Sequence, residues 1–170
     1  MSERRGCIEA YLDIETTGLS PFCNMITVIG IYLCDGIDDT FIQLYGGDVT
    51  CENLSAALER ADTIYTYNGK RFDLPFINAF LGINLEEKFQ HNDLMYTCWE
   101  HNLRGGFKSV ERQLGIDRET EGISGYHAVL LWERYRHLND IDSLELLLKY
   151  NKEDVINLKI LKEKLAGMAV

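Results

Sequence analysis

Near its start the chain reads Ile8-Glu9-Ala10-Tyr11-Leu12-Asp13-Ile14-Glu15-Thr16-Thr17-Gly18, an apolar run that ends in two carboxylates. Its alternation predicts a β-strand over residues 7–14. Side chains two apart on a strand share a face, with their Cα atoms roughly 7 Å apart. The even-numbered apolar residues of the run would therefore face a core, whereas Tyr11, Asp13 and Glu15 would face the other way.

The pair Asp13 and Glu15 needs a physical reason. Neighbouring carboxylates on a central strand repel one another and resist losing their water. A bound divalent cation is the most economical reason to place them there. The alternative is an edge strand whose polar face is solvated, because exposed carboxylates are common.

The composition bounds the class of protein. The chain has 170 residues, 46% of them hydrophobic and 26% charged, which predicts one globular domain over residues 1–170. No apolar run approaches the length of a membrane span or follows the charged start, so we expect a cytoplasmic protein with no membrane partner. The formal net charge of −10 gives no support to broad, non-specific nucleic-acid binding. It leaves a nucleic-acid enzyme open, since a metal site accounts for part of the excess acid.

Five cysteines are scattered along the chain. An odd number without close pairs fits neither a disulfide framework nor a zinc site. We therefore expect reduced and mostly buried thiols.

Hydrophobic periodicity predicts an α/β protein, a mixed sheet with helices on both faces. Two strands follow the first, and a turn at Asp35-Gly36 makes them antiparallel to each other. Short helices then alternate with further strands. The predicted strands cover residues 7–14, 25–34, 40–45, 63–67 and 88–91, and the predicted helices cover residues 54–60, 74–81, 93–102, 109–114, 126–137 and 142–165.

The last predicted helix carries polar residues on its apolar stripe. Asn151 and Asp154 fall on the stripe that runs from Leu144 to Leu165. A carboxylate on a buried stripe needs a partner, a cation or a changed pKa. Tyr150 lies four residues before Asp154, so its phenol is one turn away on nearly the same face.

Two other acidic residues stand at expected helix starts. Asp73 follows a β-like run and a glycine turn, and Pro75 comes after it. A helix N-cap and a metal ligand are both open for Asp73, although capping leaves its neighbours Asn68 and Phe72 unexplained. Asp93 is expected to cap the following helix, which explains it fully, and a direct metal role is the less favoured alternative.

These residues together resemble the DEDD superfamily of 3′-to-5′ exonucleases, which has an RNase H-like fold. The first motif of that family matches Asp13-Ile14-Glu15-Thr16-Thr17-Gly18-Leu19, the second matches Asn68-Gly69-Lys70-Arg71-Phe72-Asp73, and the third, tyrosine-type motif matches Tyr150-Asn151-Lys152-Glu153-Asp154. The motifs occur in the family's order and span most of the chain. Their wording is most similar to the YprB-like branch, through residues 67–75 and 107–115.

A sister subfamily has a histidine five residues before the aspartate, and His137 and Asp142 have that spacing. They stand at a helix boundary, where Asn139-Asp140 is turn and cap chemistry. That version would leave Asp154 on an apolar stripe without a reason. We therefore prefer the tyrosine version of the motif.

The resemblance implies a five-stranded RNase H-like sheet and phosphodiester hydrolysis with two Mg²⁺ or Mn²⁺ ions. Asp13, Glu15 and Asp154 would bind the first ion, Asp73 would help Asp13 with the second, and Tyr150 would orient the attacking water. Oxygen ligands suit hard cations and argue against zinc. Because four gathered carboxylates cannot all stay ionised without cations, we expect at least one raised carboxyl pKa in the metal-free protein.

Substrate contacts are expected beside these carboxylates. The strand end and the second motif would meet the terminal nucleotide, with Phe72 offering a face for stacking, and basic residues would hold phosphates. The expected nucleic-acid contacts are Thr16, Thr17, Gly18, Leu19, Asn68, Phe72 and Lys108, and Lys70, Arg71, Arg104 and Arg112 are further basic candidates.

The leading interpretation is a metal-dependent 3′-to-5′ exonuclease that acts on single-stranded or 3′-end DNA or RNA. The alternatives are a non-catalytic RNase H-fold module for nucleic-acid binding or scaffolding, and a structure-specific endonuclease on the same fold. The sequence does not identify a protein partner or choose between DNA and RNA, since no element reads as a 2′-hydroxyl sensor.

Overall fold

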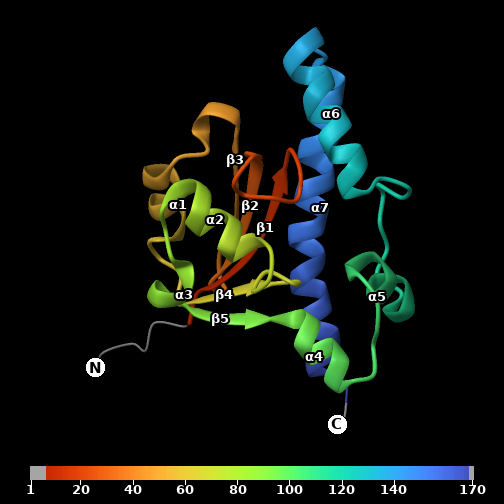
Figure 1. Cartoon of the computed structure of the whole chain (residues 1–170). Coiled ribbons are helices and arrows are strands. Elements are labelled where there is room, and N and C mark those ends of the chain that lie inside the picture. Colours follow the sequence, from red (N-terminus) through yellow and green to blue (C-terminus); the bar gives the residue numbers. More distant parts are fainter. Residues whose placement is uncertain (1–6, 169–170) are drawn as a thin grey trace.

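The computed structural model describes residues 7–168 and shows a twisted sheet between two groups of helices (Figure 1). The strands are β1 (Glu9–Thr16), β2 (Ile26–Cys34), β3 (Thr40–Tyr45), β4 (Thr63–Thr66) and β5 (Gln90–Asp93). The α-helices are α1 (Cys51–Leu58), α2 (Asp73–Leu81), α3 (Leu85–Lys88), α4 (Leu94–Glu100), α5 (Phe107–Leu114), α6 (Gly125–Leu138) and α7 (Ile141–Ala166), and a 3-10 helix covers Gly46–Asp48.

The sheet has the order β3-β2-β1-β4-β5. β1 pairs antiparallel with β2, and β2 antiparallel with β3. β4 runs parallel to both β1 and β5. The predicted mixed sheet is confirmed, and the edge-strand alternative for residues 7–14 is wrong, because β1 lies at the centre with a partner on each side.

Each face of β1 contacts a different core. Ile8, Ala10, Leu12 and Ile14 pack with residues of α1 and α2, and these helices lie on one side of the sheet in Figure 1. Tyr11 packs on the other side with residues of α4, α5 and α7. The side-chain alternation that the sequence predicted is therefore present, and it directs Asp13 and Glu15 toward α7.

α7 lies close against the sheet because β2 has a glycine beneath it. Gly30 is the Cα partner of Asp13 across the β1–β2 pair. A Cβ at Gly30 would stand 2.7 Å from Cγ2 of Val155 and closer still to Oδ1 of Asn151. This close approach brings the polar residues of α7 to the carboxylates of β1.

Several element boundaries differ from those predicted. α1 begins at Cys51, three residues before the predicted start, because the Thr50 side chain accepts a hydrogen bond from the Asn53 N–H at 3.1 Å and caps the helix. β5 is shifted by two residues, to Gln90–Asp93. α3 and the 3-10 helix are too short to have a periodic signal.

The cysteines are free, but the expectation that most are buried is wrong. Cys34 and Cys98 are buried, whereas Cys7, Cys23 and Cys51 are exposed. Within residues 7–168, none of the helices combines the length and the apolar character that crossing a membrane requires.

Candidate active site

Three carboxylates meet where the C-terminal half of β1 faces α7. Asp13, Glu15 and Asp154 each offer an oxygen, and these oxygens all lie within 4.8 Å of one another. Glu15 and Asp154 are buried. The spacing of the first motif places Asp13 and Glu15 on one face of β1. The packing of α7 against the sheet adds Asp154, which lies 139 positions after Glu15 in the chain. A cluster of carboxylate oxygens is a donor set that fits a hard divalent cation.

Asp73 is a fourth carboxylate at the same cavity. It is the first residue of α2, and the N-cap position belongs to Phe72, so the N-cap alternative for Asp73 is wrong. Its Oδ1 instead accepts a hydrogen bond from the Ile14 N–H at 3.2 Å. Asp73 is buried and lines the cavity together with Asp13 and Asp154.

Asp93 caps α4, as predicted, and also holds the turn that carries the second motif. It accepts the Met95 N–H at 3.1 Å, the Asn68 N–H at 2.7 Å and the Lys70 N–H at 3.1 Å. Asn68 has a φ of 63°, a left-handed conformation that asparagine tolerates better than most residues. Asp93 thus fixes the turn from which Asn68 reaches the cavity.

A row of polar groups fixes Asp13 from behind. Asn151 is fully buried on α7, and its Nδ2 donates to Oδ2 of Asp13 at 3.1 Å and to the Asp13 carbonyl at 3.3 Å. Its Oδ1 accepts a hydrogen bond from Nε2 of Gln43 at 2.8 Å. Asn151 occupies the space above Gly30, so residues of three strands and α7 determine the orientation of one carboxylate.

Burial raises the pKa of each of the four carboxyls. It raises the pKa of Asp13 and of Glu15 well above the usual range, and the charges of Asp154 and Asp73 raise both further. Burial raises the pKa of Asp73 to about 7 and also raises that of Asp154, although Arg118 opposes the rise. The expected raised carboxyl pKa is therefore present. A raised pKa means that these carboxyls tend to keep their protons in the metal-free protein. A bound cation would stabilise their ionised forms and displace those protons.

Tyr150 lies one turn before Asp154, and both side chains line the cavity. Burial, and then the charges of Asp154, Glu15 and Asp13, raise the pKa of Tyr150. Nζ of Lys108 lies 4.3 Å from the centre of the Tyr150 ring. Lys108 also donates to the Ile123 carbonyl, and burial lowers its pKa. The Tyr150 phenol thus keeps its proton at neutral pH, and its ring lies beside the amino group of Lys108.

The carboxylates open onto a cavity of about 640 Å³, a volume typical of ligand sites. Six of the seven residues expected to contact nucleic acid line it, namely Thr16, Thr17, Gly18, Leu19, Asn68 and Phe72. Lys108 lines an adjoining cavity that also contains Asp13, Tyr150 and Asp154. Tyr67, Gly125, Tyr126 and Val129 line the larger cavity as well. Tyr67 begins the stretch 67–75 that resembles the YprB-like branch, whereas no motif marks the other three residues, which come from the first two turns of α6.

The other basic candidates do not line either cavity. Arg71 and Arg104 both place their guanidinium groups 5.7 Å from the ring centre of Trp99 on α4. Lys70 and Arg112 line two further, smaller cavities. Arg71 and Arg104 therefore form a basic pair next to the turn of the second motif, outside the carboxylate cavity.

The histidine alternative fails on geometry. His137 is exposed in the last turn of α6, and its Nε2 lies 2.8 Å from a carboxylate oxygen of Glu133. Asp140 caps α7 by accepting the Ser143 N–H at 3.2 Å, which is the cap chemistry expected there. The tyrosine version is the one whose residues reach the cavity.

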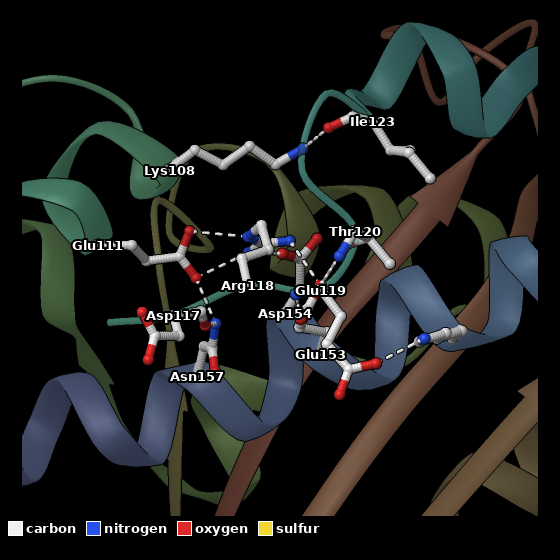
Figure 2. A network of polar contacts seen from close by, with 11 residues as sticks. Lys108, Glu111, Asp117, Arg118, Glu119, Thr120, Ile123, Glu153, Asp154 and Asn157 are labelled. Carbon is white, nitrogen blue, oxygen red and sulfur yellow. Dashed lines mark hydrogen bonds and ion pairs between the residues drawn. The ribbon is translucent and has the colours of Figure 1, made fainter. Parts of the chain in front are cut away.

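Sequence reasoning missed Arg118, whose guanidinium contacts Asp154 (Figure 2). It belongs to the segment between α5 and α6, where no periodicity or motif marks it. A buried arginine without a motif gives no signal in a single sequence.

Comparison with known families assigns the fold. A family model described as the RNase H superfamily matches residues 10–166. The chain therefore belongs to the RNase H superfamily, as the three motifs predicted. Membership of the YprB-like branch stays a prediction. No curated protein sequence matches the chain.

Two solved structures illustrate the shared fold. The family B DNA polymerase of the archaeon Pyrobaculum calidifontis aligns with a TM-score of 0.71 and 18% identity, over 94% of this chain and 24% of the polymerase. NrnC of Brucella melitensis, bound to pGG, aligns with a TM-score of 0.62 and 23% identity, over 96% of this chain and 73% of NrnC. The chain thus spans about a quarter of the polymerase and most of NrnC.

Proposed function

We propose that this protein is a metal-dependent nuclease that removes nucleotides from the 3′ end of single-stranded DNA or RNA. The observation that carries the proposal is the group of three carboxylate oxygens within 4.8 Å, set in a cavity with Asp73 and Tyr150. Membership of the RNase H superfamily and the ordered DEDD motifs support it.

The carboxylates would hold two Mg²⁺ or Mn²⁺ ions. Asp13, Glu15 and Asp154 would bind one, and Asp13 and Asp73 would bind the other. When bound, such ions activate a water molecule and stabilise the oxygen that leaves.

Tyr150 would orient the attacking water. Because its pKa is raised, the phenol keeps its proton at neutral pH and serves as a hydrogen-bond donor and acceptor, not as a general base. Lys108 would face a phosphate of the substrate, since it lines the cavity that contains Asp13 and Asp154.

The remaining cavity residues would hold the terminal nucleotide. Phe72 is half-buried and its ring centre is 5.6 Å from that of Phe76, which fixes the ring and leaves a face for a base. Asn68 and the loop Thr16–Leu19 would supply polar contacts to the sugar and phosphate. NrnC, whose structure is similar to that of this chain, is bound to pGG in its solved structure. This similarity supports a short nucleic-acid end as the ligand here.

The test uses 5′-labelled single-stranded DNA and RNA of the same sequence, with Mn²⁺ or with chelator. We expect a ladder of products shortened from the 3′ end with Mn²⁺, none with chelator, and none from Asp13→Ala. A 3′-terminal phosphorothioate linkage should block the ladder. Cleavage of a circular single strand would instead indicate the endonuclease alternative. Absence of cleavage from both substrates, with binding retained, would indicate the non-catalytic module and defeat the proposal.

A further inference from the structure

Arg118 is a buried cation in contact with one of the three clustered carboxylates. Its side chain is only 7% exposed, and Nη2 donates to Oδ1 of Asp154. Figure 2 shows the guanidinium between α5 and α7, with Glu111 on one side and Asp154 on the other. A carboxylate has two oxygens, so Asp154 can accept from Arg118 and still offer the second oxygen to a cation.

Arg118 is itself held rigidly. Its Nε and Nη2 donate to the two carboxylate oxygens of Glu111 at 3.0 and 2.7 Å, a bidentate pair. Glu111 is 2% exposed, and Nδ2 of Asn157 donates to its Oε1 at 2.7 Å. Asn157 lies on α7 three residues after Asp154. The network therefore ties the guanidinium to the helix that carries the carboxylate.

The segment around Arg118 is fastened to the same turn of α7. Glu153 accepts hydrogen bonds from the N–H groups of Glu119 and Thr120 and from the Thr120 hydroxyl. Its Oε2 also lies 3.6 Å from Nη1 of Arg118. Glu153 on α7 thus holds the segment in place, and the next residue, Asp154, accepts the hydrogen bond from Arg118.

The guanidinium stands behind Asp154 and not in front of it. Asp154 lines both cavities at the clustered carboxylates. Arg118 lines neither of them, and instead lines a separate cavity of about 250 Å³ with Glu111 and Arg112. An arginine that blocked the cation site would face the larger cavities.

We propose that Arg118 is a positioning residue, which fixes the Asp154 carboxylate so that its free oxygen is directed to the cation shared with Asp13 and Glu15. The inference rests on the metal site of the proposed function. Groups that hydrogen-bond a ligating carboxylate from outside the cavity fix its rotamer, and removing them commonly costs about 10- to 100-fold in metal affinity. Glu111 and Asn157 act one step further out, by holding Arg118.

A purely electrostatic role predicts the opposite sign. Arg118 is a positive charge next to a cation site, so its removal should strengthen cation binding by Coulomb's law. A positioning role predicts weaker binding, because Asp154 becomes free to rotate. The direction of the change in cation affinity therefore separates the two roles without reference to catalysis.

The experiment measures Mn²⁺ binding to the metal-free protein by calorimetry and by electron paramagnetic resonance. The first variant, Arg118→Lys, keeps the charge but loses the bidentate fork. We expect it to bind Mn²⁺ at least 10-fold more weakly at the tighter site. Thr120→Val is the matched control: it removes the hydroxyl hydrogen bond between the same segment and Glu153 without touching Asp154, and its Mn²⁺ affinity should stay within about twofold of the wild type.

A second variant tests whether weaker Mn²⁺ binding by Arg118→Lys is due to misfolding. Arg118→Lys leaves the buried Glu111 poorly paired, whereas the double variant Glu111→Met with Arg118→Met removes both charges together, a replacement that buried ion pairs often tolerate. It should also bind Mn²⁺ at least 10-fold more weakly. In an Asp154→Asn background, Arg118→Lys should have no further effect, because the arginine acts through Asp154.

Unchanged or tighter Mn²⁺ binding by both arginine variants would overturn the positioning role while leaving the proposed function in place. An equal loss in Thr120→Val would also overturn it, since the segment and not the guanidinium would then be responsible. A wild-type protein that binds no Mn²⁺ would overturn the metal site itself, and the role of Arg118 with it.

Discussion

The substitution Asp73→Asn is expected to stabilise the metal-free protein, although it removes a residue proposed to act in catalysis. Asp73 is 5% exposed and its carboxylate accepts a hydrogen bond from the Ile14 N–H, which an asparagine oxygen can also accept. The exchange is nearly isosteric. Its main effect is to replace a group that ionises at neutral pH by one that does not.

The magnitude follows from the pKa. Burial raises the pKa of Asp73 from 3.8 to about 7, and each tenfold change in proton affinity is worth about 1.36 kcal/mol. The stability that this group contributes is fully present below pH 3.8 and is lost as pH rises through about 7. For this group taken alone, Asp73→Asn should therefore gain at most about 2 kcal/mol at pH 5 and at most about 4 kcal/mol at pH 8 relative to the wild type.

The assay is equilibrium unfolding in urea, with chelator, at pH 5 and pH 8. Because the neighbouring carboxyls titrate together with Asp73, part of the gain is shared among them, and about 2 to 4 kcal/mol is expected at pH 8. Saturating Mn²⁺ should reduce or reverse the difference in the free energy of unfolding between Asp73→Asn and the wild type, since a bound ion stabilises the wild type more than the variant.

Two controls bracket the interpretation. Asp38→Asn changes an exposed carboxylate and should leave stability unchanged within about 0.5 kcal/mol. Asp93→Asn makes the same chemical change at a buried carboxylate that accepts three backbone N–H groups, and it should destabilise by about 1–3 kcal/mol. Equal stability of Asp73→Asn and wild type at both pH values would refute the argument that buried ionisation strains the metal-free site.

Further predictions concern other parts of the site. Mn²⁺ binding near pH 7 should release protons, so calorimetry in two buffers of different ionisation enthalpy should give different heats, and identical heats would contradict the raised carboxyl pKa values. Gly30→Ala should destabilise the protein by about 1–3 kcal/mol and weaken Mn²⁺ binding, because its methyl group would displace Asn151, and a melting temperature equal to that of wild type would count against this packing. Tyr150→Phe should lower kcat about 10- to 100-fold at unchanged Mn²⁺ affinity, whereas an unchanged kcat would remove its proposed role. Replacing Arg71 and Arg104 by Gln should weaken binding of a long single strand and reduce its salt dependence without affecting Mn²⁺ binding, and an unaltered salt slope would show that the pair does not meet phosphate.

The sequence was sufficient where the backbone geometry of one element fixes the answer. The period of two in β1 places Asp13 and Glu15 on one face whatever surrounds the strand, and the period of the helix places Asp154 on a buried stripe beside Tyr150. Those spacings, with the second motif, also predicted the family, and the hydrophobic periodicity of the whole chain predicted the mixed sheet. Sequence spacing was weaker at element ends, where a capping side chain such as Thr50 moved the start of a helix.

The sequence left two roles open for Asp73, for a reason that is local. A helix start after a glycine turn is where an N-cap is expected, but Phe72 occupies the cap position, and Asp73 turns inward to the Ile14 N–H. Whether a carboxylate at a helix start caps the helix or faces a neighbouring strand depends on how the two elements pack, and Asp93, which also stands at a helix start, does cap its helix.

The groups that support the carboxylates are visible in the folded protein and not in the sequence. Asn151 reaches Asp13 because Gly30 leaves room on a strand more than a hundred residues away, and Gln43 completes the row from the next strand. Arg118 lies in a segment without periodicity, and its contacts with Glu111 and Asp154 come from two different helices. The residues of one element are determined by its own repeat, whereas contacts between elements depend on how they pack. The four carboxylates and the tyrosine could therefore be predicted from the sequence, whereas the residues that hold them follow from the packing of α5, α7 and the sheet.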